Sequence, residues 1–151
     1  MITLALTGHT RGLGEVIHRY LTHKGHRVLG FSTTNGYDLR NYSQVSRMID
    51  CVQGSDWFIN CAKPDYAQSQ ILYRLMASGF SGKVLNIGSP VVHQQPGWTD
   101  LGLLEYVTQK VALHHAHGML NTLYPGQLIM WEPNHTLEQY YVWAYLASIG
   151  L

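Results

Sequence analysis

The chain has 151 residues, enough for one domain with a substantial core, and 46% of them are hydrophobic. Charged residues make up only 13%, about half the usual share, and the net charge is +1 with no cluster of Lys or Arg. This balance excludes the electrostatic pattern of a protein that binds nucleic acid or a membrane surface. It also favours an oligomer, because some of the surface is then not exposed to water.

The first fourteen residues predict a strand, a glycine-rich turn and the start of a helix. An apolar run over residues 2–6 is followed by glycines at positions 8, 12 and 14. Glycine at such a turn permits positive φ and lets the backbone amides approach a phosphate. The helix that follows has apolar residues at helical spacing, namely Leu13, Val16, Ile17, Tyr20 and Leu21. The stretch predicts a nucleotide-binding turn, although a glycine turn used only for packing explains it equally well.

A second short strand is predicted over residues 27–31, at the distance expected for a strand–helix–strand unit. In dinucleotide-binding folds an acidic residue at the end of this strand hydrogen-bonds the ribose 2′-hydroxyl of NAD. Here Ser32, Thr33 and Thr34 follow the strand, with no carboxylate. An ordinary turn explains the same residues, but nothing in them would repel a 2′-phosphate.

The rest of the chain alternates helices and strands. Asp38 and Leu39 follow closely, which leaves no room for a full helix and strand before a helix that we expect Ser43 to cap. Further elements are predicted over residues 57–62, 66–78, 84–87, about 101–120, 128–131 and 137–146. Right-handed connections of this kind bury a parallel sheet on both faces. The prediction is a single α/β domain over residues 1–151, a three-layer α/β/α sandwich whose mostly parallel sheet has five or six strands.

Tyr106 and Lys110 carry chemistry on the helix that begins near residue 101. Residues four apart lie one turn from each other on the same helix face. A phenol is a poor acid at neutral pH, and a neighbouring ammonium makes it a better one by stabilising the phenolate. Taken alone, this spacing is explained more simply by an exposed Tyr/Lys pair on a helix surface.

The chain carries TGxxxGLG, INCA, a strand ending in IGS, and YxxxK in that order, and so resembles the short-chain dehydrogenase/reductase family over residues 2–113. The resemblance implies an unusually short, Rossmann-like fold truncated at its C-terminal end, with strand order similar to 3-2-1-4-5-6 and a vestigial third strand. It implies a catalytic trio of Ser89, Tyr106 and Lys110. It also implies a set of cofactor-binding residues, which includes two of this trio. They are Thr7, Gly8, Thr10, Arg11, Gly12, Leu13, Gly14, Ser32, Thr33, Asp38, Leu39, Asn60, Ala62, Tyr106, Lys110 and Pro133.

The chain departs from the family pattern at three places. Cys61 and Lys63 replace the second Asn and the Gly of the strand motif, and the segment between Ser89 and Tyr106 is longer than usual. The helix after the strand motif lacks the Asn that many members use in a proton relay.

The resemblance implies an NADP(H)-dependent oxidoreductase that interconverts a carbonyl and an alcohol on a small molecule. Arg11 in the glycine turn favours NADP(H), with NAD(H) as the alternative cofactor. Two other functions stay open, namely a catalytically silent NADP(H) sensor and an epimerase that uses the same Tyr/Lys pair. We expect a homodimer or homotetramer that pairs the helices over residues 66–78 and 101–123.

Three histidines at positions 114, 115 and 117 raise the question of a metal site. Only two of them can share a helix face, and no carboxylate or cysteine ligand is expected near them, so no metal is predicted. No signal peptide precedes the first strand and no apolar run is long enough to span a bilayer, which predicts a cytoplasmic protein.

Overall fold

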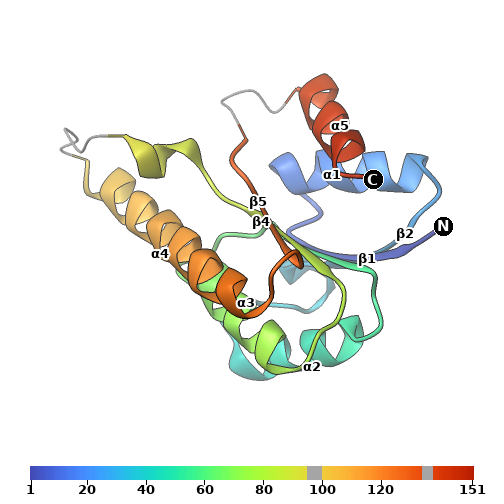
Figure 1. Cartoon of the computed structure of the whole chain (residues 1–151), viewed down its shortest axis with the longest axis horizontal. Coiled ribbons are helices and arrows are strands. Elements are labelled where there is room, and N and C mark those ends of the chain that lie inside the picture. The colour runs from blue at the N-terminus through green and yellow to red at the C-terminus, as the bar shows by residue number, and fades with distance from the viewer. Residues whose placement is uncertain (95–99, 134–137) are drawn as a thin grey trace.

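The computed structural model describes residues 1–94, 100–133 and 138–151 (Figure 1). Its centre is one five-stranded sheet in the order β2-β1-β3-β4-β5, with every neighbouring pair parallel. The strands are β1 (Thr3–Thr7), β2 (Arg27–Phe31), β3 (Trp57–Asn60), β4 (Lys83–Ile87) and β5 (Leu128–Trp131). The predicted α/β fold is confirmed.

Helices cover both faces of the sheet, which gives three layers (Figure 1). On one face lie α1 (Gly12–His23) and α5 (Gln139–Ser148), which contact each other. On the other face lie α2 (Tyr42–Val52), α3 (Ala67–Ala77) and α4 (Leu101–Leu123). Two short 3₁₀ helices, η1 (Thr33–Asn35) and η2 (Pro90–His93), follow β2 and β4.

The alternation of side chains along each strand divides the core in two. In β1, Leu4 and Leu6 pack toward α1 and α5, whereas Ala5 packs toward α2, α3 and α4. All three side chains are fully buried. A strand that is apolar at every position is typical of a parallel sheet covered on both faces.

Three details differ from the sequence predictions. No third strand of the 3-2-1-4-5-6 order forms in the described part of the chain, because η1 and a short loop pass directly into α2. Asn41, not Ser43, caps α2, since its side chain accepts a hydrogen bond from Gln44 N at 3.0 Å. The last helix begins at Gln139, and the predicted start at residue 137 lies outside the described residues.

The strand order also fixes where a ligand can bind. The chain leaves β1 for β2 on one side, whereas β3 pairs with β1 on the other side. At such a reversal the loops that follow the two central strands diverge and leave a crevice at their carboxyl ends. Among the described residues, none of the helices is long and apolar enough to cross a membrane.

Candidate active site

A cavity of about 810 Å³ lies at the carboxyl ends of β1, β3 and β4. Its lining combines the glycine turn after β1, the loops after β3 and β4, one face of α4, and Pro133 after β5. Ten of the residues proposed from the sequence line it, namely Gly8, Arg11, Gly12, Leu13, Gly14, Ala62, Ser89, Tyr106, Lys110 and Pro133. The structure therefore brings the expected cofactor turn and the expected catalytic trio to one cavity.

The turn after β1 has the form of an anion cradle. Gly8 takes a φ of +71°, and a Cβ on Gly14 would lie 1.9 Å from the Gly8 carbonyl oxygen. Arg11 occupies the N-cap position of α1, but its side chain makes no capping hydrogen bond. The first amides of the helix therefore face the cavity without a capping partner. Backbone amides and the positive end of the helix dipole favour a phosphate there. A Cβ on Gly8 would likewise lie 3.0 Å from Ala62 Cβ, so both glycines let the turn pack closely. The uncapped amides of this turn fit the pyrophosphate of a dinucleotide.

Thr7 holds this turn by hydrogen bonds to the loop after β3. Its buried hydroxyl accepts hydrogen bonds from Cys61 N at 2.9 Å and Ala62 N at 3.0 Å, and lies 3.4 Å from the Ile59 carbonyl. Thr7 thus joins the end of β1 to the loop after β3, and it does not line the cavity.

Lys110 is a buried charge at the edge of the cavity. Its side chain is 3% exposed, and its ammonium donates to Gln68 Oε1 and to the Ile87 carbonyl, both at 2.9 Å. Burial and, to a smaller extent, the charge of Lys63 lower the pKa of Lys110 to about 8. An ammonium has three N–H groups, and the two fixed here leave one for a ligand in the cavity.

Gln68 on α3 orients Lys110, and the sequence analysis did not identify it. Its amide nitrogen donates to the Asn60 carbonyl at 2.8 Å and to the Ile87 carbonyl at 3.0 Å. Asn60 Nδ2 in turn donates to the Gln68 carbonyl and to Asn86 Oδ1. The signal in the sequence is a glutamine on the buried face of a helix, between Ala67 and Ile71. Asn60, expected at the cofactor, is fully buried in this network and does not line the cavity.

Tyr106 lies between two lysines. The centre of its ring is 4.8 Å from Lys63 Nζ and 5.9 Å from Lys110 Nζ. Ser89 lines the same cavity from the loop after β4, and its backbone amide donates to His114 Nε2 at 3.3 Å.

The remaining predicted cofactor residues lie outside the cavity lining. Ser32 and Thr33 form the start of η1, where Ser32 N donates to Asn35 Oδ1 at 2.9 Å. Asp38 Oδ1 accepts from Arg40 N at 3.0 Å, and Leu39 is buried in the core beside α2. Thr10 is exposed in the glycine turn. These residues shape the loops around β2, and their contact with a cofactor stays a prediction.

The three histidines of α4 have different surroundings. His115 is exposed, His117 Nδ1 lies 3.0 Å from Asn86 Nδ2, and His114 Nδ1 lies 3.6 Å from Glu132 Oε1. Burial lowers the pKa of both His114 and His117. The expectation that no carboxylate lies near them was wrong, because the end of β5 brings Glu132 beside α4, a proximity that sequence separation hides.

The fold closely matches those of solved dehydrogenases. A small-chain dehydrogenase is 13% identical with a TM-score of 0.79 over 99% of this chain and 90% of that chain. A metagenomic short-chain oxidoreductase in complex with NADP is 17% identical with a TM-score of 0.73, over 98% of this chain and 90% of its own. The 3-alpha-hydroxysteroid dehydrogenase from Pseudomonas sp. B-0831, complexed with NADH, is 17% identical with a TM-score of 0.67, over 87% and 71%.

No protein-family model matches the sequence, and a search of curated protein sequences finds no significant relative. The structural likeness therefore rests on the fold. The chain has the fold of the short-chain dehydrogenase/reductases over nearly its whole length, which confirms the fold that the sequence resemblance implied.

Proposed function

We propose that this protein is an NADP(H)-dependent oxidoreductase that interconverts a carbonyl and an alcohol on a small molecule. One observation carries the proposal: a glycine cradle for a dinucleotide and the set Ser89, Tyr106 and Lys110 line the same cavity. The neighbours of the same fold that are complexed with NADP or NADH support a nicotinamide cofactor.

The chain's own residues would position the substrate and move one proton. A nicotinamide cofactor supplies or accepts the hydride when bound. During reduction Tyr106 would donate its phenolic proton to the carbonyl oxygen, and Ser89 would hydrogen-bond the same oxygen. Lys110, fixed by Gln68 and by the Ile87 carbonyl, would stabilise the resulting phenolate and hold the ribose next to the nicotinamide.

Incubation with NADPH and a panel of small carbonyl compounds tests the proposal. An oxidoreductase consumes NADPH, a sensor binds it without consuming it, and an epimerase shows no net oxidation. The variant Tyr106→Phe should keep NADPH binding and lose turnover about 10²- to 10⁴-fold, the contribution of a general acid. Retention of most of the activity in Tyr106→Phe would remove Tyr106 from the mechanism.

The preference for NADP(H) over NAD(H) is supported by two features near the cradle. Arg11 lines the cavity at the start of α1 and makes no ion pair within the part of the chain that is described. The loop after β2 begins with Ser32, Thr33 and Thr34, none of which offers a carboxylate against a 2′-phosphate. A guanidinium pairs well with phosphate oxygens.

We also propose a homodimer or homotetramer in which α3 and α4 pair with their mates. Apolar side chains are exposed on both helices, with Tyr73 at 46%, Val111 at 46%, Met119 at 56% and Leu123 at 72%. Exposed apolar surface marks an interaction site where it forms a large patch. Helix pairing about a twofold axis would bury it.

A further inference from the structure

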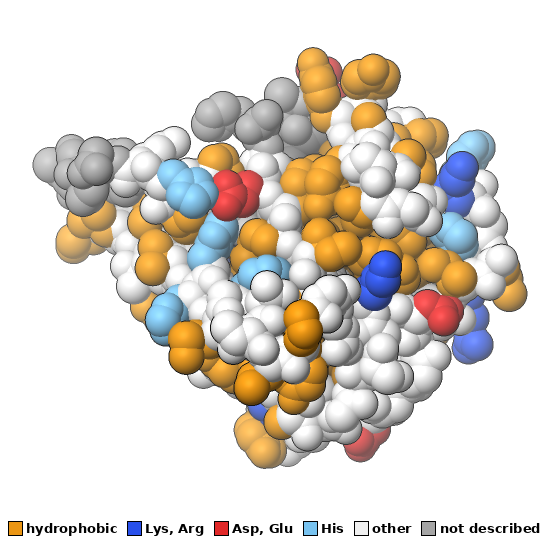
Figure 2. Space-filling view, viewed as in Figure 1, with side chains coloured by type: hydrophobic (Ala, Val, Ile, Leu, Met, Phe, Trp, Pro, Cys, Tyr) orange, Lys and Arg blue, Asp and Glu red, His pale blue; other side chains and the backbone are white. Residues whose placement is uncertain are grey.

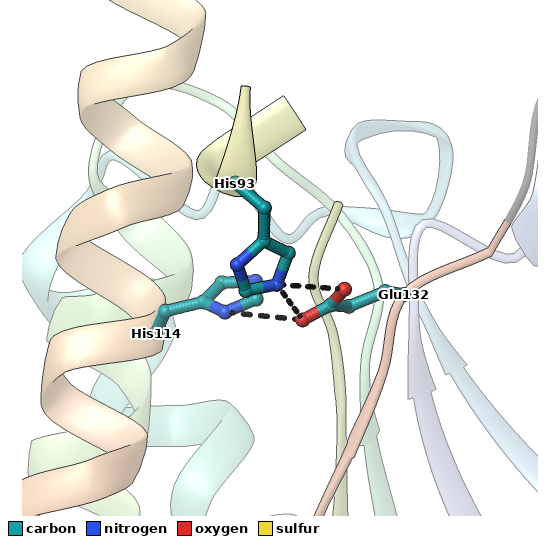
Figure 3. A group of neighbouring side chains, drawn as sticks. All are labelled: His93, His114 and Glu132. Carbon is teal, nitrogen blue, oxygen red and sulfur yellow. Dashed lines mark hydrogen bonds and ion pairs between the residues drawn. The ribbon is translucent and has the colours of Figure 1, made fainter. Parts of the chain in front are cut away.

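Three side chains from separate elements converge at the surface beside α4 (Figure 3). His93 ends η2, His114 lies in the middle of α4, and Glu132 directly follows β5. His93 Nε2 lies 2.8 Å and 3.0 Å from the two carboxylate oxygens of Glu132. His114 Nδ1 lies 3.6 Å from Glu132 Oε1, and the three possible ligand atoms are all within 4.8 Å of one another.

We propose that His93, His114 and Glu132 form a binding site for a divalent transition-metal ion such as Zn²⁺. Two imidazole nitrogens and one carboxylate oxygen are donors that Zn²⁺ takes, with water in the fourth position. Ligand atoms about 2.0–2.1 Å from a tetrahedral ion are roughly 3.3–3.5 Å apart, a separation that lies within the range observed here. Mg²⁺ and Ca²⁺ are poor alternatives because they prefer oxygen ligands.

The surroundings suit an ion that enters from solvent. The side chains are 66% exposed for His93, 30% for Glu132 and 18% for His114. The exposed His93 side chain can therefore move to join the two more buried ligands when an ion binds. His114 packs against Gly88 so closely that a Cβ added to Gly88 would lie 2.3 Å from His114 Nε2. Figure 2 shows histidines gathered over this face with an acidic side chain beside them, while Lys and Arg lie elsewhere in the view.

Metal binding would affect the catalytic cavity through one hydrogen bond, between His114 and Ser89. Ser89 N donates to His114 Nε2, which places the imidazole proton on Nδ1 in the metal-free protein. A metal on Nδ1 needs a lone pair there, so the proton would move to Nε2 and Ser89 N would lose its acceptor. This bond is long, at 3.3 Å, and its loss costs little compared with a metal–ligand bond. Occupancy of the site should therefore be detectable at Ser89.

Calorimetric titration of the full chain with Zn²⁺ alone tests the proposal. The chain has nine histidines, so Zn²⁺ uptake by itself does not identify the site. Variants of the proposed ligands show whether the bound Zn²⁺ lies there. We expect one tight Zn²⁺ per chain, weakened at least tenfold by His93→Ala and by Glu132→Gln. The control is His115→Ala, which removes an exposed imidazole one residue from His114 and should leave the tight binding intact.

A second measurement follows the Ser89 amide resonance by NMR during the same titration. It should shift in the parent chain and stay in place in Glu132→Gln, whose fold is checked by circular dichroism. The proposal is rejected if the parent shows no saturable Zn²⁺ binding, or if His93→Ala and Glu132→Gln bind Zn²⁺ as tightly as the parent. It is also rejected if Mg²⁺ at the same concentration competes with Zn²⁺ for the site.

Discussion

Lys110 allows a quantitative prediction, because burial lowers the pKa of its ammonium from 10.5 to about 8. Between these two values the unfolded chain keeps a proton that the folded chain has released. The free energy of unfolding must then rise with pH in this range. The destabilising effect of the buried ammonium is fully present below pH 8 and is lost as the pH approaches 10.5. The two pKa values give a rise of about 1 kcal/mol between pH 7 and 9.

The perturbation is Lys110→Met, which keeps much of the side chain and removes the charge. It removes the donor of Gln68 Oε1 and one of the two donors of the Ile87 carbonyl, which still accepts from Gln68 Nε2, and this cost does not change with pH. The free energy of unfolding of the parent minus that of the variant should therefore rise by about 1 kcal/mol from pH 7 to 9. Burial also raises the pKa of Cys61 to about 11, but this thiol is present in both proteins, so most of its effect cancels.

Urea unfolding followed by tryptophan fluorescence, at half-unit steps of pH, gives the two curves. Lys24→Met removes an exposed lysine and is the matched control. A parent-minus-variant difference that is flat for Lys110→Met would refute the reasoning. It would mean that the Lys110 ammonium is as well stabilised inside the folded chain as it is in water.

Four further predictions concern the cradle, the network, the cofactor and the assembly. Gly14→Ala should weaken NADPH binding at least tenfold by driving a Cβ into the Gly8 carbonyl, whereas Gly118→Ala, with open space around it, should stabilise α4 by up to about 1 kcal/mol. Gln68→Leu should cost about 1–3 kcal/mol in urea unfolding, and an unchanged midpoint would contradict the network. Arg11→Ala should weaken NADPH binding about ten- to a hundredfold by calorimetry and leave NADH nearly unchanged; equal losses for both would overturn the preference for NADP(H). Light scattering at micromolar concentration should give an oligomer that Met119→Glu dissociates, and a monomeric parent would reject the proposed assembly.

The elements of the fold could be predicted because their signals are local. β2 and β5 have the predicted ends, and the apolar spacing of α1 identified its buried residues, among them Ile17, Tyr20 and Leu21. The cap of α2 was misplaced by two residues, since Asn41 and Ser43 are both good capping residues and sequence alone does not rank them there.

The candidate site could be predicted only where its residues form a motif. The glycine turn and the Tyr106/Lys110 pair have fixed internal spacings, Ser89 directly follows a predicted strand, and all of them line the cavity. Gln68 and Glu132 have no such spacing, because each meets its partner through the packing of separate elements. Gln68 reaches Lys110 across 42 positions, and Glu132 reaches His93 across 39. Contacts of this kind become visible only when the strand order is known.

The strand order also explains how this site can form when the described residues contain no third strand of the 3-2-1-4-5-6 order. In the 3-2-1-4-5-6 order the missing strand would lie beyond β2, at the outer edge of the sheet. Most residues that form the cavity come from the ends of β1, β3 and β4, which are the three inner strands, and from α1 and α4, with Pro133 after β5. The missing strand instead affects the loops around β2. There Ser32, Thr33 and Asp38 make hydrogen bonds within their own turns. Selectivity at the adenine end of a dinucleotide should accordingly depend on the glycine turn and Arg11 more than on β2, which is the physical reason to place the NADP(H) test at Arg11.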